Sequence, residues 1–105
     1  MEIPELDWKT FKEVRSSALD RFCRGILDEC RAVCVDDSGT AHERYLKLYD
    51  LIRQRDKEMA DAFDDFRRST AILSLMVMCE HNLVTPEELA RFSLDTRHRL
   101  AHLQA

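Results

Sequence analysis

Hydrophobic residues in the first third of the chain recur every three or four positions, which is the period of an amphipathic α-helix. The stripe consists of Trp8, Phe11, Ala18, Phe22, Ile26, Cys30 and Val33, widened by Leu19, Cys23 and Leu27. Asp7 precedes it, and Leu6 and Phe11 bracket Asp7 as a hydrophobic staple would, so Asp7 is the expected N-cap. The pattern predicts a helix over residues 8–35, ended by the turn-forming residues 35–39.

A second helical pattern begins at Thr40-Ala41-His42-Glu43, which has the sequence of a capping box. Its core-facing positions step by three and four, without a glycine or proline before Asn82: Tyr45, Tyr49, Ile52, Asp56, Met59, Phe63, Phe66, Thr70, Leu73 and Val77. We therefore predict one helix over residues 41–82. An acid at Asp56 would cost stability there unless it is paired, with Arg53 or with an arginine of another helix. If the stripe lies one position away, Asp56 is a surface residue.

Two shorter helices are expected after this one. Thr85-Pro86-Glu87-Glu88 is a second capping box, with proline at the first helical position. It predicts a helix over residues 86–92. Ser93 is placed to cap a last helix over residues 94–103, in which Leu100 and Leu103 form a weak apolar edge.

The long helix raises a problem of coverage. Residues 41–82 would span about 63 Å as one helix, whereas a compact domain of this size is only about 30 Å across. The segment from Ala71 to Cys79 is apolar nearly all round, so it requires neighbours on more than one side. The cover could come from the C-terminal helices, from a bend near residues 67–70, or from a second copy of the chain.

We expect an all-α, antiparallel helical hairpin or bundle with coiled-coil character, one long central helix and short C-terminal helices. It forms a single domain over residues 1–105, and we expect it to be a homodimer. The expected interface consists of Phe63, Phe66, Leu73, Met76 and Val77.

The composition agrees with a helical domain and limits the classes of partner that we expect. The chain has 105 residues, of which 45% are hydrophobic, with only two glycines and two prolines to turn the backbone. Its 16 basic and 20 acidic residues are interleaved, and no basic stripe emerges, which disfavours nucleic-acid binding. The longest uncharged run, from Ser69 to Cys79, is far shorter than the roughly 20 residues of a membrane span. No secretory signal is visible, so we expect a cytoplasmic protein without a membrane partner.

Four cysteines are the most conspicuous candidate ligands: Cys23, Cys30, Cys34 and Cys79. A reducing compartment favours free thiols, and each cysteine falls within an apolar stripe, where it behaves as a small hydrophobic residue. The alternative is a metal-binding or thiol-redox bundle in which His81 adds a ligand to the four thiols. The CxxC spacing typical of structural zinc is absent, so the core interpretation is favoured.

Three further groups are weaker candidates. His98 and His102 have the spacing of a zinc-binding pair, but Arg99 stands where a zinc-protease helix has glutamate, so we interpret them as solvent-facing. The acidic cluster of Glu58, Asp61, Asp64 and Asp65 is expected to be a solvated helix face with Arg67 and Arg68 as partners. Tyr45, Tyr49 and Trp8 could line a pocket between helix ends, but aromatics at this spacing more commonly form core.

No catalytic motif with a recognisable local signature is present. We therefore predict a small non-catalytic helical protein without a cofactor, acting through protein partners as an adaptor or regulator. The cysteine-based metal or redox bundle is the alternative, and a small-ligand enzyme in the bundle core has only Asp56 and the tyrosines in its favour.

Overall fold

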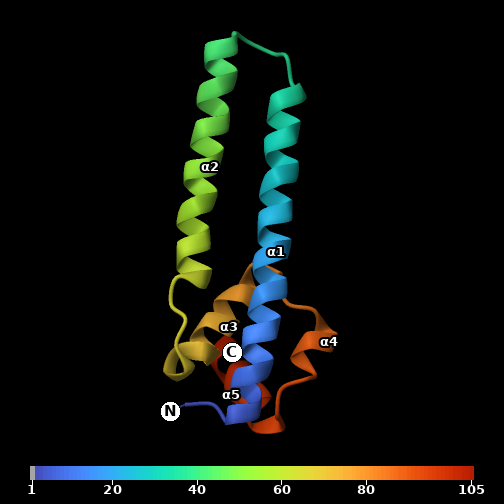
Figure 1. The fold of residues 1–105 in the computed structure, drawn as a ribbon, viewed down its shortest axis with the longest axis vertical. Coiled ribbons are helices and arrows are strands. Elements are labelled where there is room, and N and C mark those ends of the chain that lie inside the picture. Colours follow the sequence, from blue (N-terminus) through green and yellow to red (C-terminus); the bar gives the residue numbers. More distant parts are fainter. Residues whose placement is uncertain (1) are drawn as a thin grey trace.

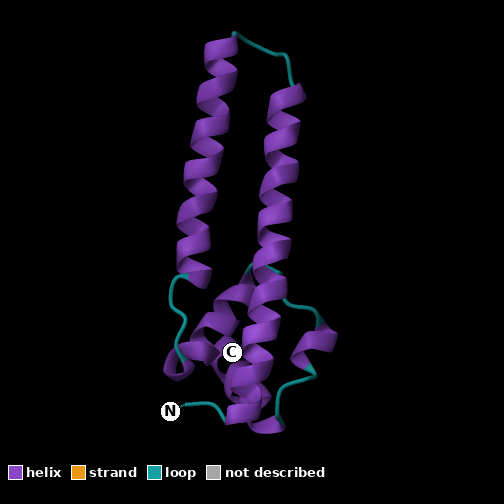
Figure 2. Ribbon diagram, in the orientation of Figure 1, coloured by secondary structure: helices purple, strands orange, loops and turns teal. Residues whose placement is uncertain are grey.

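In the computed structural model, which describes residues 2–105, every element of regular structure is a helix (Figures 1 and 2). In chain order these are α1 (Glu5–Val35), α2 (Ala41–Phe63), the 3-10 turn η1 (Arg68–Thr70), α3 (Ala71–Glu80), α4 (Pro86–Leu89) and α5 (Leu94–Gln104). The predicted all-α class is confirmed. Among the described helices, none combines the length and the apolar character needed to cross a bilayer.

The molecule is elongated, measuring 54 × 25 × 22 Å, and has two parts (Figure 1). The C-terminal half of α1 runs antiparallel to α2, and the two project together as an arm, which we define as residues 23–61. The N-terminal half of α1 lies with α3, α4 and α5 in a base. At the tip of the arm, Gly39 has a φ of 81°, a left-handed conformation that glycine adopts without strain.

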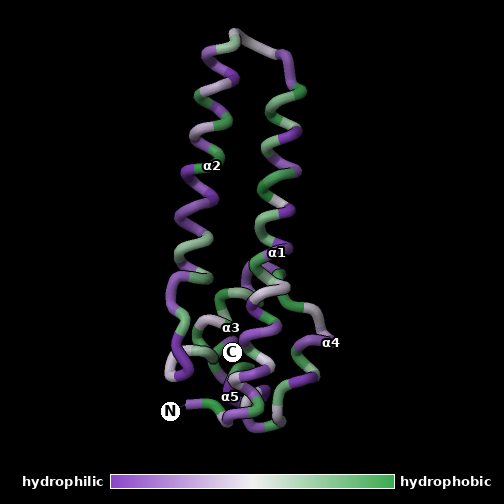
Figure 3. Tube along the Cα trace, viewed as in Figure 1, coloured by the Kyte–Doolittle hydropathy of each residue, from purple (hydrophilic) through white to green (hydrophobic). Residues whose placement is uncertain are grey.

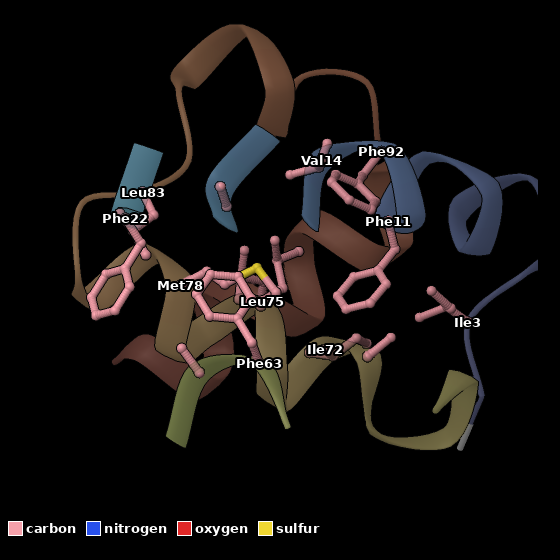
Figure 4. Close-up of a cluster of buried hydrophobic side chains, with 14 residues drawn as sticks. Ile3, Phe11, Val14, Phe22, Phe63, Ile72, Leu75, Met78, Leu83 and Phe92 are labelled. Carbon is pink, nitrogen blue, oxygen red and sulfur yellow. The ribbon is translucent and has the colours of Figure 1, made fainter. Parts of the chain in front are cut away.

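The hydrophobic core lies in the base, where side chains from α1, α3 and the end of α2 converge (Figure 4). Phe22 of α1 packs against Phe63 of α2 with ring centroids 6.0 Å apart. The buried apolar residues are Ile3, Phe11, Val14, Ala18, Phe22, Ala62, Phe63, Ala71, Ile72, Leu75, Met78, Leu83, Phe92 and Leu100. Between Phe22 and Ala62 no residue is buried. The base therefore supplies most of the hydrophobic stabilisation.

Both predicted capping boxes and the predicted serine cap are confirmed. The Thr40 hydroxyl accepts from the Glu43 amide at 3.1 Å, and the Glu43 carboxylate accepts from the Thr40 amide at 3.0 Å. The same reciprocal pair joins Thr85 and Glu88 at 3.1 and 2.9 Å. The Ser93 hydroxyl accepts from the third residue after it, at 3.3 Å.

The prediction of one helix over residues 41–82 is wrong. α2 ends at Phe63, residues 64–67 are not helical, and α3 starts at Ala71. No glycine or proline causes this break, so its cause lies in contacts across the base. The Arg15 guanidinium donates to the Phe63 carbonyl at 2.7 Å, which satisfies one of the carbonyl groups exposed at a helix end.

The side chain of Phe66 anchors the linker between α2 and α3. Its ring lies 5.4 Å from that of Trp8 in an edge contact, and the Arg15 guanidinium stacks on it at 4.2 Å. The Ser74 hydroxyl donates to the Asp65 carbonyl at 3.2 Å. These contacts turn the chain back into the base, so the apolar α3 is covered by its own chain and does not require a second copy.

The prediction that Asp7 caps α1 is also wrong. α1 begins at Glu5 after Pro4, and Leu6 is exposed, so no hydrophobic staple forms. Asp7 is instead 3% exposed and holds the start of α5. Its carboxylate accepts from the Ser93 amide at 2.9 Å, from the Ser93 hydroxyl at 2.6 Å and from the Thr96 hydroxyl at 2.5 Å. Burial acts to raise the pKa of Asp7, but these hydrogen bonds outweigh it and the pKa lies below the ordinary carboxyl value.

A second set of contacts attaches α1 to α4 and to the loop before it. The Arg21 guanidinium donates to both carboxylate oxygens of Glu88, at 2.7 and 3.0 Å, and also to the Leu83 carbonyl. The paired guanidinium is the main reason that the pKa of Glu88 lies below its ordinary value. Glu88 thus serves both the capping box of α4 and the attachment of α4 to α1.

Gly25 offers a direct test of the arm's helical geometry. It lies inside α1, and a Cβ built there would meet no atom within 4 Å. We expect Gly25→Ala to raise the free energy of unfolding by about 0.5–1 kcal/mol, because alanine restricts the unfolded chain and fits the helix. Urea denaturation followed by circular dichroism measures this change. A loss of stability would show that another group contacts α1 at this position.

Candidate interaction surface

The side of α2 that faces α1 is marked by partly buried residues at helical spacing. They are Leu48, Leu51, Arg55 and Met59, followed by the buried Ala62. On α1 the corresponding partly buried residues are Ile26, Cys30 and Val33. This is a narrow seam between two helices, and it leaves the remaining surface of both helices in contact with solvent.

The predicted core stripe of α2 is therefore displaced from the observed one. Tyr45 is 61% exposed, Tyr49 is 50% exposed and Ile52 is 48% exposed. Asp56, which belongs to the same stripe, is also exposed, so its alternative interpretation as a surface residue is correct. Of the predicted stripe, Tyr45, Tyr49 and Ile52 thus form an exposed row, whereas Met59 lies in the seam and Phe63 lies in the core, as predicted.

Together with part of α1, this stripe makes one apolar side of the arm, which we call the tyrosine face. Tyr45 and Cys34 line the same shallow pocket of about 270 Å³, so they lie on the same side of the arm. Leu27 is one heptad before Cys34 on α1 and is 62% exposed. The tyrosine face consists of Leu27 and Cys34 from α1 and of Tyr45, Tyr49 and Ile52 from α2, and Cys30 of the seam lies at its edge. Figure 3 shows apolar positions continuing along both helices of the arm, beyond the base.

The aromatic rings of the tyrosine face form a row along α2. The rings of Tyr45 and Tyr49 are stacked with centroids 6.5 Å apart, and His42 stacks on Tyr45 at the same distance. The Arg53 guanidinium lies 5.9 Å from the centre of the Tyr49 ring. These contacts hold the rings in place without covering their outer surfaces, which gives a pre-ordered apolar surface.

Ion pairs between the two helices lie elsewhere on the arm. Arg55 donates to both oxygens of Glu29, at 3.0 and 2.9 Å, and also to Glu58 at 3.1 Å. Nearer the tip, Lys47 lies 3.8 Å from Asp36. The hydrogen bonds from Arg55 hold the pKa of Glu29 below its ordinary value. Since these groups are satisfied within the chain, they fix how the helices are paired and leave the apolar side unpartnered.

The five predicted interface residues have unequal access to solvent. Phe63 is in the core at 3% exposure. Met76 and Val77 are partly buried against the core. Phe66 and Leu73 are exposed, and Phe66 lies against Trp8 while Leu73 borders a groove between α3 and α5.

The cysteine set is divided between the two parts of the molecule. Cys23, Cys30 and Cys34 are on α1 in the arm, whereas Cys79 is on α3 and His81 follows that helix. Burial, and to a lesser extent Glu80, raises the pKa of Cys79 and so favours its thiol over the reactive thiolate. Within residues 2–105, no three His, Cys, Asp or Glu side chains are grouped to hold a metal ion.

The groove between α3 and α5 contains the histidine pair. It has a volume of about 470 Å³ and is lined by Ser69, Ile72, Leu73, His98, Arg99, His102 and Leu103. His98 and Leu103 are exposed at its edge, in line with the predicted solvent-facing histidines. Trp8 lies in the base, so it does not meet the tyrosines of the arm to form a pocket.

The acidic cluster is solvent-facing, as predicted. Asp61, Asp64 and Asp65 are exposed, and Asp65 accepts from Arg67 at 2.7 Å. The cluster is not one helix face, however, because Asp64 and Asp65 follow the end of α2, and Glu58 is partly buried and accepts from Arg55. The other predicted partner, Arg68, turns to the N-terminal segment, where it donates to the Ile3 carbonyl at 2.8 Å and to Glu5.

No family model, curated protein or solved structure matches the chain. Its function is therefore argued from its own surface.

Proposed function

We propose that this chain is a non-catalytic interaction protein, an adaptor or regulator, that binds a protein partner through the tyrosine face of its arm. The observation that carries the proposal is the exposure of Tyr45, Tyr49 and Ile52 in one row on a helix pair that buries no residue of its own. Contiguous exposed apolar surface is uncommon on monomeric proteins and marks interaction sites.

The chemistry of the tyrosine face fits this role. Tyrosine is enriched among the residues that dominate binding energy, because its ring buries a large area at a small entropic cost. The rings here are stacked on one another and on His42, so little side-chain freedom is left to lose on binding. Asp7 and Arg21 attach α1 to the base, which anchors the arm at that end.

A site-specific cross-linking experiment tests the proposal. Photoreactive benzoylphenylalanine is placed at Tyr49 or, as a control, at Gln54, which is exposed and lies on another side of α2. We expect a protein adduct from position 49 in the cells that make the protein, and none from position 54. Adding Ile52→Glu should abolish the adduct, because it places a charge in the centre of the tyrosine face.

The matched control in this experiment is Gln54→Glu, which adds the same charge away from the tyrosine face. It should leave the adduct from position 49 intact. Equal adducts from positions 49 and 54, or no adduct at either, would refute the proposed function.

A further inference from the structure

We infer that the occupant of the tyrosine face is a second copy of this chain, and that the two arms pack face to face and antiparallel as a four-helix bundle. This inference rests on the proposed function. It uses the same binding surface and adds the identity of the partner. It follows from three properties of the arm: its symmetry, its length and its area.

The tyrosine face of α2 is self-complementary about Tyr49. His42 and Asp56 each lie seven residues from Tyr49, on the same side of the helix, and Tyr45 and Ile52 lie four and three residues away. If two copies of α2 cross antiparallel at Tyr49, the imidazole of His42 in one copy faces the carboxylate of Asp56 in the other. The apolar residues then meet between these two polar contacts, as a two-fold interface requires.

The same two-fold axis brings the cysteines of α1 together. The ion pairs Arg55–Glu29 and Lys47–Asp36 set the level of α1 beside α2 and place Tyr49 level with the segment from Cys30 to Cys34. In the antiparallel pair, the segment from Cys30 to Cys34 of one copy therefore lies beside the same segment of the other. Small, soft side chains at this position allow the two α1 helices to approach closely.

The length of the arm fits this arrangement. From Ala41 to Met59, α2 is about 27 Å long. A crossing point at Tyr49 is near the middle of that length, so the tip of each arm reaches the start of the other copy's base without entering it. In Figure 1 the base is wider than the arm, and the antiparallel arrangement would place the two bases at opposite ends of the pair.

The area is sufficient for a specific, reversible dimer. A face about 27 Å long and two helices wide, roughly 20 Å, measures on the order of 500 Å² in each copy. The total of about 1,000 Å² is at the lower end of biological interfaces, above most incidental contacts. We therefore expect a dissociation constant on the order of micromolar.

Sedimentation velocity between 1 and 200 µM tests the dimer. The wild-type chain should change from the 12.3 kDa monomer to a species of twice that mass as the concentration rises. Ile52→Glu should weaken association by about 100-fold or more, whereas Gln54→Glu should leave it unchanged. Because both positions are exposed, circular dichroism should show folded protein in each case.

Charge exchange tests the antiparallel arrangement. His42→Glu places an acid opposite Asp56 of the second copy and should weaken association by about 5- to 10-fold. Adding Asp56→Lys should restore association to within about threefold of the wild type. Weakening that the second substitution does not rescue would overturn the antiparallel pairing.

Disulfide formation tests the pairing of α1. A chain with Cys30 and Cys34 as its only cysteines should cross-link to a dimer under copper phenanthroline and oxygen, which accept the two electrons and two protons of the paired thiols. A chain that keeps only Cys79 should stay uncross-linked, and efficient cross-linking there would overturn the inference.

The inference and the proposed function fail separately. A monomer throughout the concentration range, or a dimer that survives Ile52→Glu, overturns the second copy as the occupant. If the adduct from position 49 then contains a different protein, the proposed function stands. If position 49 gives no adduct either, both the inferred dimer and the proposed function are refuted.

Discussion

Replacing Asp7 with alanine should lower the free energy of unfolding by about 3 kcal/mol, which is a large part of the stability of a small domain. The carboxylate is buried and accepts three hydrogen bonds, from the amide and hydroxyl of Ser93 and from the hydroxyl of Thr96. Alanine would leave these donors without their acceptor at the start of α5. Urea denaturation at neutral pH measures the loss.

The matched control is Asp95→Ala, in the exposed first turn of the same helix. It removes only a favourable interaction with the helix dipole, about 0.5 kcal/mol. Equal losses from the two variants would contradict the structural role of Asp7.

The contribution of Asp7 should also depend on pH. Its folded-state pKa lies below the ordinary value of 3.8, so folding favours the ionised carboxylate. The stabilisation is complete above the pKa of the unfolded chain and declines as the pH falls through the folded-state pKa. The difference in stability between the wild type and Asp7→Asn should therefore narrow when the pH is lowered from 7 to 3. A difference that widens would contradict the direction of the pKa shift.

Replacing Phe63 with alanine should cost about 4 kcal/mol, the second large effect that the structure predicts. The ring is 3% exposed, packs beside Phe22 and lies under the Arg15 guanidinium, 5.7 Å from its centre. The variant should lose stability even at concentrations where the chain is monomeric. Thermal unfolding at concentrations well below the expected micromolar dissociation constant measures that loss with little contribution from association.

Phe66→Ala provides the matched control, since it removes the same side chain three residues further on. Phe66 is 42% exposed, so its loss should cost less than half as much as that of Phe63. If Phe63→Ala leaves the monomer stable and weakens association instead, the residue belongs to an interface and its assignment to the core is wrong.

Local signals in the sequence were enough to predict the class of fold and most helix boundaries. The capping boxes at Thr40 and Thr85, the cap at Ser93 and the turn at Gly39 are all present. Each depends on residues close together in the chain, where side-chain chemistry alone determines the hydrogen bonds. The first two helices, joined by the short turn after Val35, also run antiparallel as expected.

Features that depend on distant contacts could not be predicted in this way. The break after Phe63 has no glycine or proline, and it depends on Arg15, 48 residues earlier. Asp7 has the sequence signature of a local cap, but its partners lie 86 and 89 residues away. A local pattern cannot show that a better partner exists elsewhere in the fold.

The orientation of α2 was mispredicted because its sequence supports two stripes. The stripe of Tyr45, Tyr49 and Ile52 continues into Asp56, and the observed seam with α1 continues from Leu48 and Leu51 into Arg55, so each stripe is mostly apolar and contains one charged residue. Helical period cannot distinguish the two stripes, and the pairing of Arg55 with Glu29, 26 residues earlier, is not visible in a local pattern. The residues of the proposed interaction surface were therefore recognised as an apolar stripe in the sequence, but they were assigned to the core. From the sequence, a second copy was expected to cover the segment that forms α3. In the structure, α3 is covered by other parts of the same chain, and the uncovered apolar row is on the arm.

Amide hydrogen exchange at two protein concentrations tests most directly the central claim, that two copies meet through their arms. It compares exchange at 1 and 200 µM in the unmodified chain, so no substitution disturbs the fold. We predict that exchange slows at the higher concentration in residues 24–35 and 41–58, and stays unchanged in α3 and α5. Slowing confined to the base, or identical exchange at both concentrations, would contradict the claim.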